Sequence, residues 1–228
     1  MEKTELLVNH NPKSSFSESI KTVRTNLQFS LVNSNVKVIL LTSPEPGDGK
    51  SFVSANLAAA FAQENKKVLL IDSDLRKGRQ HRIFNIKNDR SKGYSNLILS
   101  SKDEHTINSF IEHTEIDNLD LLPTGAMPPN SSELLASINN KELITKLRKM
   151  YDIIILDCAP VLGLNDTLVM TKLSDVNVVV VTKRKTKIEL LDQVKKSFEK
   201  VNSKINGVIL NRVKQEDNSY YGYYGETS

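Results

Sequence analysis

The segment from Thr42 to Ser51 holds the residue types and spacing that best fit phosphate chemistry. Its two glycines, Gly47 and Gly49, allow the backbone N–H groups of a tight turn to approach an anion closely. Lys50 can reach the β- and γ-phosphates of a nucleotide, and the Ser51 hydroxyl can hold Mg²⁺. A helix that starts at this point adds the favourable dipole of its N-terminus. We therefore interpret the segment as a phosphate-binding loop.

The match to the strict pattern G-x-x-x-x-G-K-[ST] is incomplete, because Pro44 stands where that pattern has its first glycine. The alternative is a polar turn that contains Gly-Lys-Ser by chance. An apolar run precedes the turn and an Ala-rich stretch follows it, which is the strand–turn–helix order of phosphate loops. The residues that we expect to bind the nucleotide here are Pro46, Gly47, Asp48, Gly49, Lys50, Ser51 and Phe52.

Two further apolar runs end in carboxylates. One run leads into Asp72 and Asp74, and the other ends at Asp157. Ligands of open parallel sheets bind outside the carboxyl ends of the strands, so these groups can converge on the glycine-containing turn. Asp157 fits a Walker-B role beside Mg²⁺, and Asp72 and Asp74 suit a metal contact or the acceptance of a hydroxyl proton. The alternative is that each Asp only caps a helix or forms a turn.

Alternating strand and helix patterns must position these groups. Strands are expected at 36–42, 67–72, 119–122, 152–157, 176–182 and 205–211. Helices are expected at 51–64, 94–100, 105–112, 131–149, 165–173 and 187–202, after a first helix with the apolar stripe Phe16, Ile20, Val23, Leu27 and Leu31. Nearly continuous Val and Ile runs are typical of parallel strands covered on both faces. We therefore predict an α/β fold: a single P-loop NTPase domain whose mostly parallel, doubly wound sheet has helices on both faces.

Length and composition agree with one globular domain. The 228 residues, 39% of them hydrophobic, suffice for one α/β core. We expect a flexible N-terminus over 1–13, the ATP-binding domain over 14–213 and a flexible tail over 214–228. The net charge of +4 does not predict binding to nucleic acid. The one cysteine, Cys158, allows no internal disulfide and favours the cytosol, and no apolar run reaches the roughly 18 residues that span a bilayer.

A dense basic cluster follows the Asp-x-Asp pair, and it consists of Arg76, Lys77, Arg79 and Arg82. Most clusters of this kind are solvated surface. The functional alternative is contact with a phosphate or with an acidic partner. The sequence alone leaves both open.

The tail holds four of the six tyrosines: Tyr220, Tyr221, Tyr223 and Tyr224. One Lys against Glu216, Asp217 and Glu226 gives it a net charge of −2. A tail of this composition is often only a disordered end. In a chain that binds ATP it can instead enter a neighbouring active site as substrate. Phosphorylation would add about −1.5 to −2 charges per tyrosine, and several such groups would repel one another and weaken docking.

Together these motifs resemble those of the bacterial protein-tyrosine kinases of capsule and exopolysaccharide synthesis, the BY-kinase family. The P-loop corresponds to residues 46–51, and the motif Asp-x-Asp-x-Arg corresponds to residues 72–76. The Walker-B motif Asp-x-x-Pro corresponds to 157–160, and the tyrosine cluster to 220–224. The resemblance covers 14–228, and the combination is far more specific than any single motif.

The resemblance implies an ATP-dependent tyrosine kinase that autophosphorylates its tail between subunits and also phosphorylates other proteins. Such a kinase regulates capsular or exopolysaccharide synthesis and export. The implied catalytic residues are Lys50, Asp72, Asp74 and Asp157, with Asp72 activating the tyrosine hydroxyl. The implied Mg²⁺ ligands are Ser51, Asp74 and Asp157. Asn211, which follows the last strand, resembles the adenine-side residue of the family.

The family also assembles rings through Glu-x-x-Arg-x-x-Arg on its first helix. The same positions here are Glu18, Lys21 and Arg24. Lys keeps the charge of Arg but lacks its planar fork, so the implied octamer-like homo-oligomer depends on a modified contact. The stretch 128–134 also resembles the family's Pro-Asn-Pro-Ser-Glu-Leu, with Ser131 in place of Pro.

The resemblance implies partners and a location as well. Family members either fuse the kinase to a membrane-spanning activator or keep the two as separate chains, and this chain resembles the separate form. We expect a cytoplasmic kinase that a transmembrane activator of the polysaccharide chain-length regulator type recruits to the inner face of the membrane. Protein tyrosine substrates and a cognate phosphatase complete the implied set, and no nucleic acid is expected.

The main competing hypothesis is an ATPase switch of the ParA/MinD type, which shares the strand–loop–helix core. Those proteins carry an extra lysine five residues before the P-loop lysine, where this chain has Glu45. A C-terminal amphipathic membrane helix is also absent from the pattern. A third hypothesis, a nucleotide-binding regulator without catalysis, is disfavoured because the Lys and all three Asp residues are present.

Overall fold

One sheet organises the protein. The computed structural model describes residues 6–31, 37–87 and 89–213. The strand order is β3-β4-β2-β5-β1-β6-β7, and all neighbours pair in parallel except the antiparallel edge pair β3–β4. The strands are β1 Val38–Thr42, β2 Val68–Asp72, β3 Glu112–His113, β4 Leu119–Leu122, β5 Ile153–Asp157, β6 Val176–Thr182 and β7 Gly207–Asn211.

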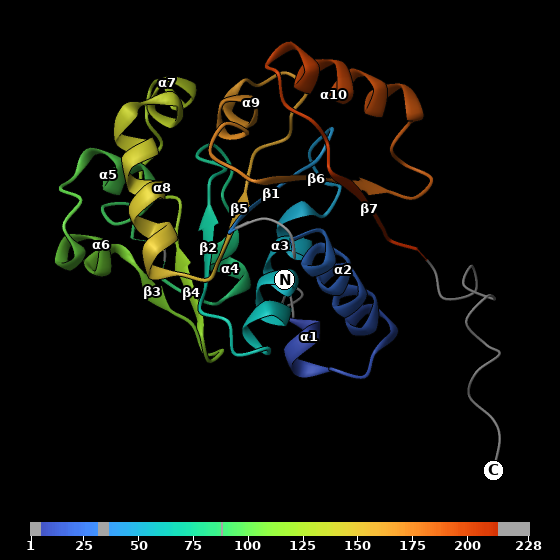
Figure 1. The fold of residues 1–228 in the computed structure, drawn as a ribbon, viewed down its shortest axis with the longest axis horizontal. Helices are drawn as coiled ribbons and strands as arrows, with labels where there is room; N and C mark the ends of the chain where they lie inside the picture. Colours follow the sequence, from blue (N-terminus) through green and yellow to red (C-terminus); the bar gives the residue numbers. More distant parts are fainter. Residues whose placement is uncertain (1–5, 32–36, 88, 214–228) are drawn as a thin grey trace.

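Helices cover both faces of this sheet (Figure 1). The first part of the chain contributes α1 Leu7–His10, α2 Ser15–Leu31, α3 Lys50–Ala62, α4 Gln80–Ile83 and α5 Tyr94–Leu99. The rest contributes α6 Glu104–Phe110, α7 Ser131–Ala136, α8 Ile138–Met150, α9 Asp166–Met170 and α10 Ile188–Lys200. In Figure 1, α2 and α3 lie on one side of the strands and α5, α6 and α8 on the other.

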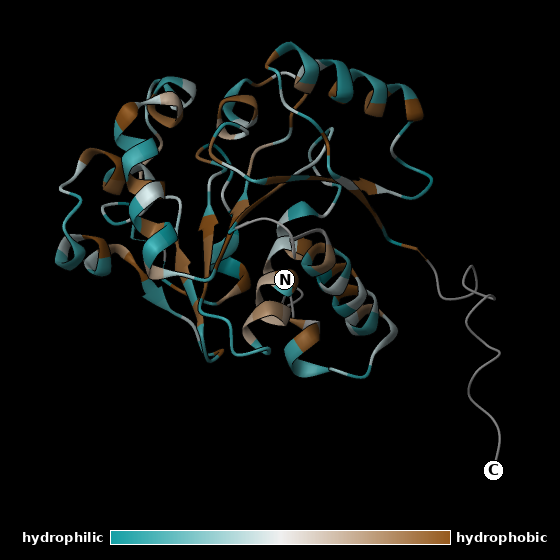
Figure 2. Ribbon diagram, in the orientation of Figure 1, coloured by the Kyte–Doolittle hydropathy of each residue, from teal (hydrophilic) through white to brown (hydrophobic). Residues whose placement is uncertain are grey.

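The central strands β1, β2 and β5 are apolar in all but their last residue because both of their faces are buried. Ile39 and Leu41 of β1 join the core beneath α1, α2 and α3, whereas Val38 and Leu40 join the core beneath α5 and α8. A third, smaller core lies between β6 and α10 around Val194. Figure 2 shows the hydrophobic colour concentrated on the central strands. The predicted doubly wound α/β architecture is therefore confirmed, and the six predicted strands are all present.

Some elements differ from the expectations. The helix expected at 131–149 is two helices, because Ser137 is extended between them and its hydroxyl accepts a hydrogen bond from Asn140 N. Glu112, expected at the end of a helix, belongs to the two-residue strand β3. Helix α4, a single turn inside the basic segment, was not expected either. Helix α4 and strand β3 are too short to show a periodic pattern.

The structure also departs from the expected flexible N-terminus over 1–13. Leu6 and Val8 are buried in the core beneath α3. The Val8 N–H donates to Asn56 Oδ1 at 3.1 Å, and Gln63 Nε2 donates to the Val8 carbonyl at 3.2 Å. The two apolar side chains of Leu6 and Val8 anchor this segment in the core. Two apolar residues are too few to form a periodic pattern that would predict the anchoring from the sequence. Residues 1–5 and the tyrosine tail over 214–228 lie outside the described residues.

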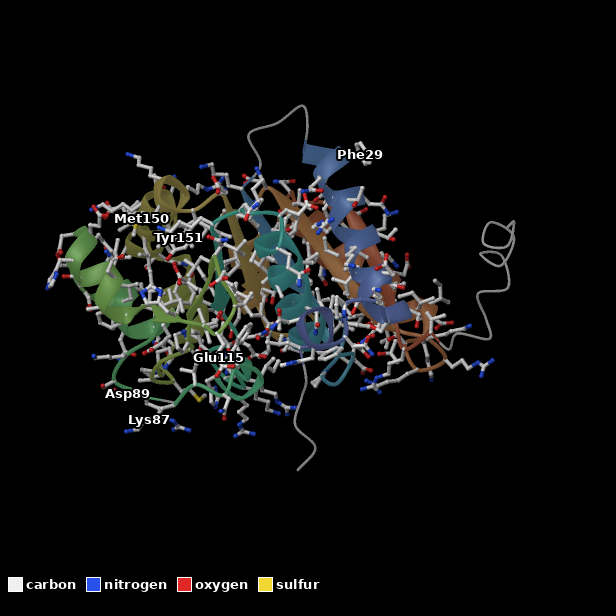
Figure 3. All side chains as sticks on the ribbon, turned by 90° about the horizontal axis from the view of Figure 1, so that it is seen from below. Phe29, Lys87, Asp89, Glu115, Met150 and Tyr151 are labelled. Carbon is white, nitrogen blue, oxygen red and sulfur yellow. The ribbon has the colours of Figure 1, made fainter. Side chains whose placement is uncertain are left out.

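Helix α2 ends with an apolar side chain in solvent. Phe29 is 73% exposed and stands clear of the body in Figure 3.

Within the described ranges, no helix is both long and apolar enough to cross a bilayer.

Changing Val8 to Ala tests the anchoring of the N-terminal segment. Val8 is fully buried, so the loss of its two methyl groups should lower the free energy of unfolding by roughly 1–3 kcal/mol. The matched control is Val213→Ala, which removes the same atoms from a 37% exposed side chain and should cost within about 0.5 kcal/mol. Urea denaturation of both variants measures this, and equal costs would contradict the anchoring.

Candidate active site

The glycine-containing turn joins β1 to α3. Gly47 and Gly49 have φ angles of 86° and 85°, which lie in the left-handed region that favours glycine. A Cβ at Gly49 would also lie 2.2 Å from Asn211 Nδ2, so no side chain fits there. The turn therefore needs glycine at position 49 for both its conformation and its contact with the end of β7.

Asp48 fixes this turn to the end of β6. Its carboxylate accepts from Lys185 Nζ at 2.9 Å and from Thr186 Oγ1 at 3.3 Å. Its carbonyl accepts from Asn211 Nδ2 at 2.9 Å and from Thr182 Oγ1 at 3.2 Å. The Asp48 side chain is buried and bonded to residues of this chain, so it stabilises the conformation of the loop.

The Lys50 ammonium lies between two carboxylates. Nζ is 3.2 Å from Asp157 Oδ1, 3.3 Å from Asp74 Oδ2 and 3.3 Å from the Ser51 hydroxyl. Burial alone would lower the pKa of Lys50, but Asp157, then Asp74 and Asp72, outweigh burial and raise the pKa above its ordinary value. Lys50 is thus a permanent cation at the carboxyl ends of three neighbouring strands.

Asp72 is a buried carboxyl with one free oxygen. It pairs with Asp157 across the β2–β5 register. Its Oδ2 accepts from the Gln80 N–H at 2.9 Å, whereas its buried Oδ1 has no hydrogen-bond partner among the described residues. Burial, followed by the negative charge of Asp157, raises the pKa of Asp72 to about 7. Near neutral pH this group can both release and accept a proton.

Gln80, at the start of α4, links these groups and was not predicted. Its Nε2 donates to Asp157 Oδ2 at 2.8 Å and to the Ser51 carbonyl at 3.0 Å. Together with its N–H to Asp72, it contacts the loop and two of the carboxylates. A lone amide within a basic run carries no spacing signal, so only the tertiary structure identifies it.

Arg76 connects the Asp-x-Asp segment to helices α7 and α9. Its Nε is 2.8 Å from Asp166 Oδ2, and the Ser132 hydroxyl donates to the same carboxylate. Asp166 begins α9 and Ser132 belongs to α7. The stretch 128–134 is therefore connected to the site through this ion pair.

A cavity of about 780 Å³ opens beside these groups, which is a typical size for a small-ligand site. Of the predicted residues, it is lined by Pro46, Gly47, Gly49, Lys50, Ser51, Phe52 and Asp74. Asp72 and Asp157 are fully buried at the adjacent strand ends. Asn211 contacts the loop backbone at Asp48, and the next residue, Arg212, lines the cavity. The structure thus brings the loop, the three carboxylates and Asn211 to one region.

The oxygen atoms around Lys50 could supply some, but not all, of the ligands of a Mg²⁺ ion. The candidate ligands, Ser51 Oγ and the carboxylates of Asp74 and Asp157, are all oxygens, which Mg²⁺ prefers. Within the described part of the chain, no group of three or more His, Cys, Asp or Glu side chains is arranged to hold a metal. These residues therefore fit a Mg²⁺ ion that takes its remaining ligands from a phosphate group and water.

The predicted ring residues lie on α2, away from this cavity. Glu18 and Lys21 form an ion pair at 2.8 Å, and the Glu18 side chain is 62% exposed. Arg24 instead binds within its own chain: NH1 donates to the Ala60 carbonyl at 2.9 Å, and NH2 lies 2.7 Å from Glu64. Glu18 and Lys21 are accessible, whereas Arg24 clamps α2 to α3.

Comparisons with known proteins point to one group of enzymes. The protein-family model described as AAA domain matches residues 36–210. Tyrosine-protein kinase YwqD of Bacillus subtilis is 38% identical over 214 residues, which cover 94% of this chain and 88% of YwqD. Tyrosine-protein kinase wzc of Salmonella typhimurium is 36% identical over 97% of this chain, but the match spans only 30% of that longer protein.

Solved structures agree with these relatives. The chimerical protein CapA2B2 has a TM-score of 0.84 and 37% identity, and the match covers 92% of this chain and 90% of that one. The kinase domain of the Escherichia coli tyrosine kinase ETK has a TM-score of 0.82 and 30% identity over 92% of this chain and 82% of that one. The cell division ATPase MinD of Pyrococcus furiosus, at a TM-score of 0.63, 24% identity and coverage of 79% and 74%, shows the shared fold alone.

Replacing Gln80 with Ala tests its linking role. The variant leaves Asp157 Oδ2 without its side-chain donor, and an unpaired buried acceptor should cost about 1–3 kcal/mol of unfolding free energy. Gln193→Ala is the control, since Gln193 is exposed on α10 and the change should stay within about 0.5 kcal/mol. Chemical denaturation measures both, and a Gln80 cost no larger than the control's would refute the assignment.

Replacing Asp72 with Asn tests its raised pKa. The folded chain holds this proton up to about pH 7, whereas an unfolded Asp loses it near pH 4. Ionisation of Asp72 therefore lowers folding stability as the pH rises from about 4 to about 7. Asn keeps an acceptor for Gln80 N–H but cannot ionise. We expect the stability of the variant relative to wild type to increase over this range, by a few kcal/mol at most.

Denaturation at several pH values measures this difference. Asp89→Asn is the control, because Asp89 is exposed and hydrogen bonds from Ser91 lower its pKa. That variant should show no gain with rising pH. A constant difference between Asp72→Asn and wild type would contradict the raised pKa.

Proposed function

The chain belongs to the bacterial tyrosine kinases, the BY-kinases, within the AAA-domain P-loop proteins, and on this premise we propose what it phosphorylates and how. It transfers the γ-phosphate of ATP to tyrosines of its own tail, between subunits, and to tyrosines of other proteins. Through these transfers it regulates capsular or exopolysaccharide synthesis and export. The observation that carries the proposal is the Lys50 ammonium between the Asp74 and Asp157 carboxylates, next to the half-paired carboxyl of Asp72.

The arrangement suits phosphoryl transfer because that reaction needs positioning and charge neutralisation more than covalent chemistry. The loop N–H groups and Lys50 would bind the phosphates of ATP, which the cavity beside them can admit. Asn211, which contacts the loop at Asp48, would lie on the adenine side. Ser51, Asp74 and Asp157 would hold Mg²⁺, whose charge would neutralise the phosphate oxygens.

In the proposed reaction, the tyrosine oxygen forms a bond to the γ-phosphorus. The bond from that phosphorus to the bridging oxygen breaks, and its electron pair leaves with ADP. The phenolic proton passes to the unpaired Oδ1 of Asp72. A carboxyl with a pKa of about 7 is well matched to this task, because it is partly ionised near neutral pH and holds the proton that it receives.

The acceptors that we propose are Tyr220, Tyr221, Tyr223 and Tyr224, presented by a neighbouring subunit. Glu18 and Lys21 would contribute to the ring contact, with Arg24 supporting α2 from within its own chain. A transmembrane activator would recruit the kinase to the cytoplasmic face of the membrane. The longer wzc relative, of which this chain spans 30%, leaves room for such an activator in one chain.

The test is mass spectrometry of the tail after incubation with Mg·ATP and an activator segment. Phosphate should appear on tail tyrosines in wild type and disappear in Lys50→Met, which loses the cation that binds the phosphates. The loss should be at least about 100-fold, as for other electrostatic groups in active sites. Lys66→Met is the matched control, because Lys66 is exposed and should keep full activity. Circular dichroism checks the fold, and Ser51→Ala serves as a second variant if Lys50→Met unfolds.

Phosphotyrosine that persists in Lys50→Met would overturn the mechanism. Phosphotyrosine that persists after all four tail tyrosines are changed to Phe would overturn the tail as acceptor. ATP hydrolysis without any transfer to tyrosine, together with lipid or DNA binding, would favour the ParA/MinD-type switch instead.

A further inference from the structure

A second cavity, of about 270 Å³, lies beside the catalytic cavity and is strongly basic. Five cationic side chains line it: Arg76, Lys77, Arg79, Arg82 and Arg90. His81 and Thr124 line it as well, and no carboxylate does. The basic cluster that the sequence singles out is therefore a concave pocket with Arg90 added from a later loop. We call it the basic pocket.

The basic pocket is continuous with the catalytic cavity. Arg76, Lys77, Arg79 and Arg82 line both. Gly78 forms part of the pocket wall, and a Cβ there would lie 1.8 Å from Thr124 Oγ1 and 2.7 Å from Asp72 Oδ2. The absent side chain at Gly78 thus brings the pocket wall against the proposed proton acceptor, Asp72.

The positive charge of the basic pocket is largely unbalanced. Arg76 pairs with Asp166, but Lys77, Arg79, Arg82 and Arg90 form no ion pair with any carboxylate of the described segments. The nearby Asp89 accepts hydrogen bonds from Ser91, and Figure 3 shows Asp89 at the outer margin of the molecule.

Two polar groups in the basic pocket, His81 and Thr124, bear on the charge of the ligand that it takes. Partial burial, and then the charges of Arg82 and Arg90, lower the pKa of His81 and so disfavour a further positive charge on its ring. The Thr124 hydroxyl is buried and has no hydrogen-bond partner in the described part of the protein. Clustered cations with an unused hydroxyl are the features of a site that takes an anion.

We propose that the basic pocket binds an acidic side chain of the protein substrate, a Glu or Asp close in sequence to the acceptor tyrosine. This inference rests on the proposed tyrosine kinase function, because it places the acceptor hydroxyl at Asp72. The chain's own tail has the required chemistry, since Glu216, Asp217 and Glu226 flank its tyrosines. The pocket thereby selects acidic tyrosine segments over neutral ones.

Arg90 is the residue with which to test this. It is exposed, and it lines the basic pocket but not the catalytic cavity. The assay uses the full chain with its four tail tyrosines changed to Phe and Glu216, Asp217 and Glu226 changed to Gln, Asn and Gln, so that its tail does not compete. The substrates are three synthetic peptides of residues 214–228: the natural one, one with those three acids neutralised, and one with all three changed to Lys.

The natural peptide should have a KM about tenfold below that of the neutral peptide at similar kcat, as expected for hydrogen bonds to charged groups. Arg90→Gln should raise the KM of the natural peptide about tenfold and leave the KM values of the neutral peptide and of ATP unchanged. Arg90→Glu should reverse the preference towards the Lys peptide. Lys204→Glu, an equal charge change at an exposed site distant in sequence, should alter none of these values.

A binding assay separates this inference from the proposed function. Fluorescence anisotropy without nucleotide, with Phe in place of each peptide tyrosine, reports the same preference independently of catalysis. If no peptide is phosphorylated but the acidic one binds more tightly and depends on Arg90, the kinase proposal fails and the pocket stands. Equal binding and equal KM for natural and neutral peptides, or a preference that survives Arg90→Glu, overturns the pocket.

Discussion

A single buried ammonium organises the functional region of this protein. Lys50 lies within 3.3 Å of both Asp74 and Asp157, and the negative charge of these groups keeps it protonated against the cost of burial. Without this cation, two carboxylates at adjacent strand ends would face Asp72 with no balancing charge, and buried like charges are costly. The ion pairs therefore explain how three aspartates can share one edge of an apolar sheet.

The sheet brings the functional residues together, and local hydrogen bonds fix the positions of their side chains. Parallel pairing of β1, β2 and β5 places their carboxyl ends side by side. Asp48 then fixes the loop to the end of β6 through Lys185 and Thr186. Gln80 fixes Asp157 against the start of α3. Lys50, Asp48 and Asp157 have defined partners, which hold the site in place before any ligand arrives, whereas the buried Asp72 Oδ1 and Gln80 Oε1 have no partner among the described residues.

The sequence predicts the parts of this site that have local signals. The glycine turn, the strand-end carboxylates and the six longer strands each have a pattern of spacing or hydropathy, and the structure contains all of them. Gln80, the Arg76–Asp166 pair and the anchoring of Val8 depend on residues far apart in the chain. No local pattern encodes such contacts. The break at Ser137 was missed because helical periodicity continues across it.

The charge of the site changes from positive in the cavity lining to negative at the buried strand ends. Carboxylates lie at the buried strand ends, Lys50 lies between them and the loop, and the rim is cationic through Arg76, Lys77, Arg79 and Arg82. These cations would attract an anionic ligand as far as Lys50, and the negative charges of Asp74 and Asp157 would repel it from the strand ends beyond. Lys50 forms ion pairs with two carboxylates, so a phosphate group would compete with Asp74 and Asp157 for the ammonium. A divalent cation bound to these carboxylates would leave the ammonium available to the phosphate. Cation and phosphate should therefore bind cooperatively, since each removes the charge that opposes the other.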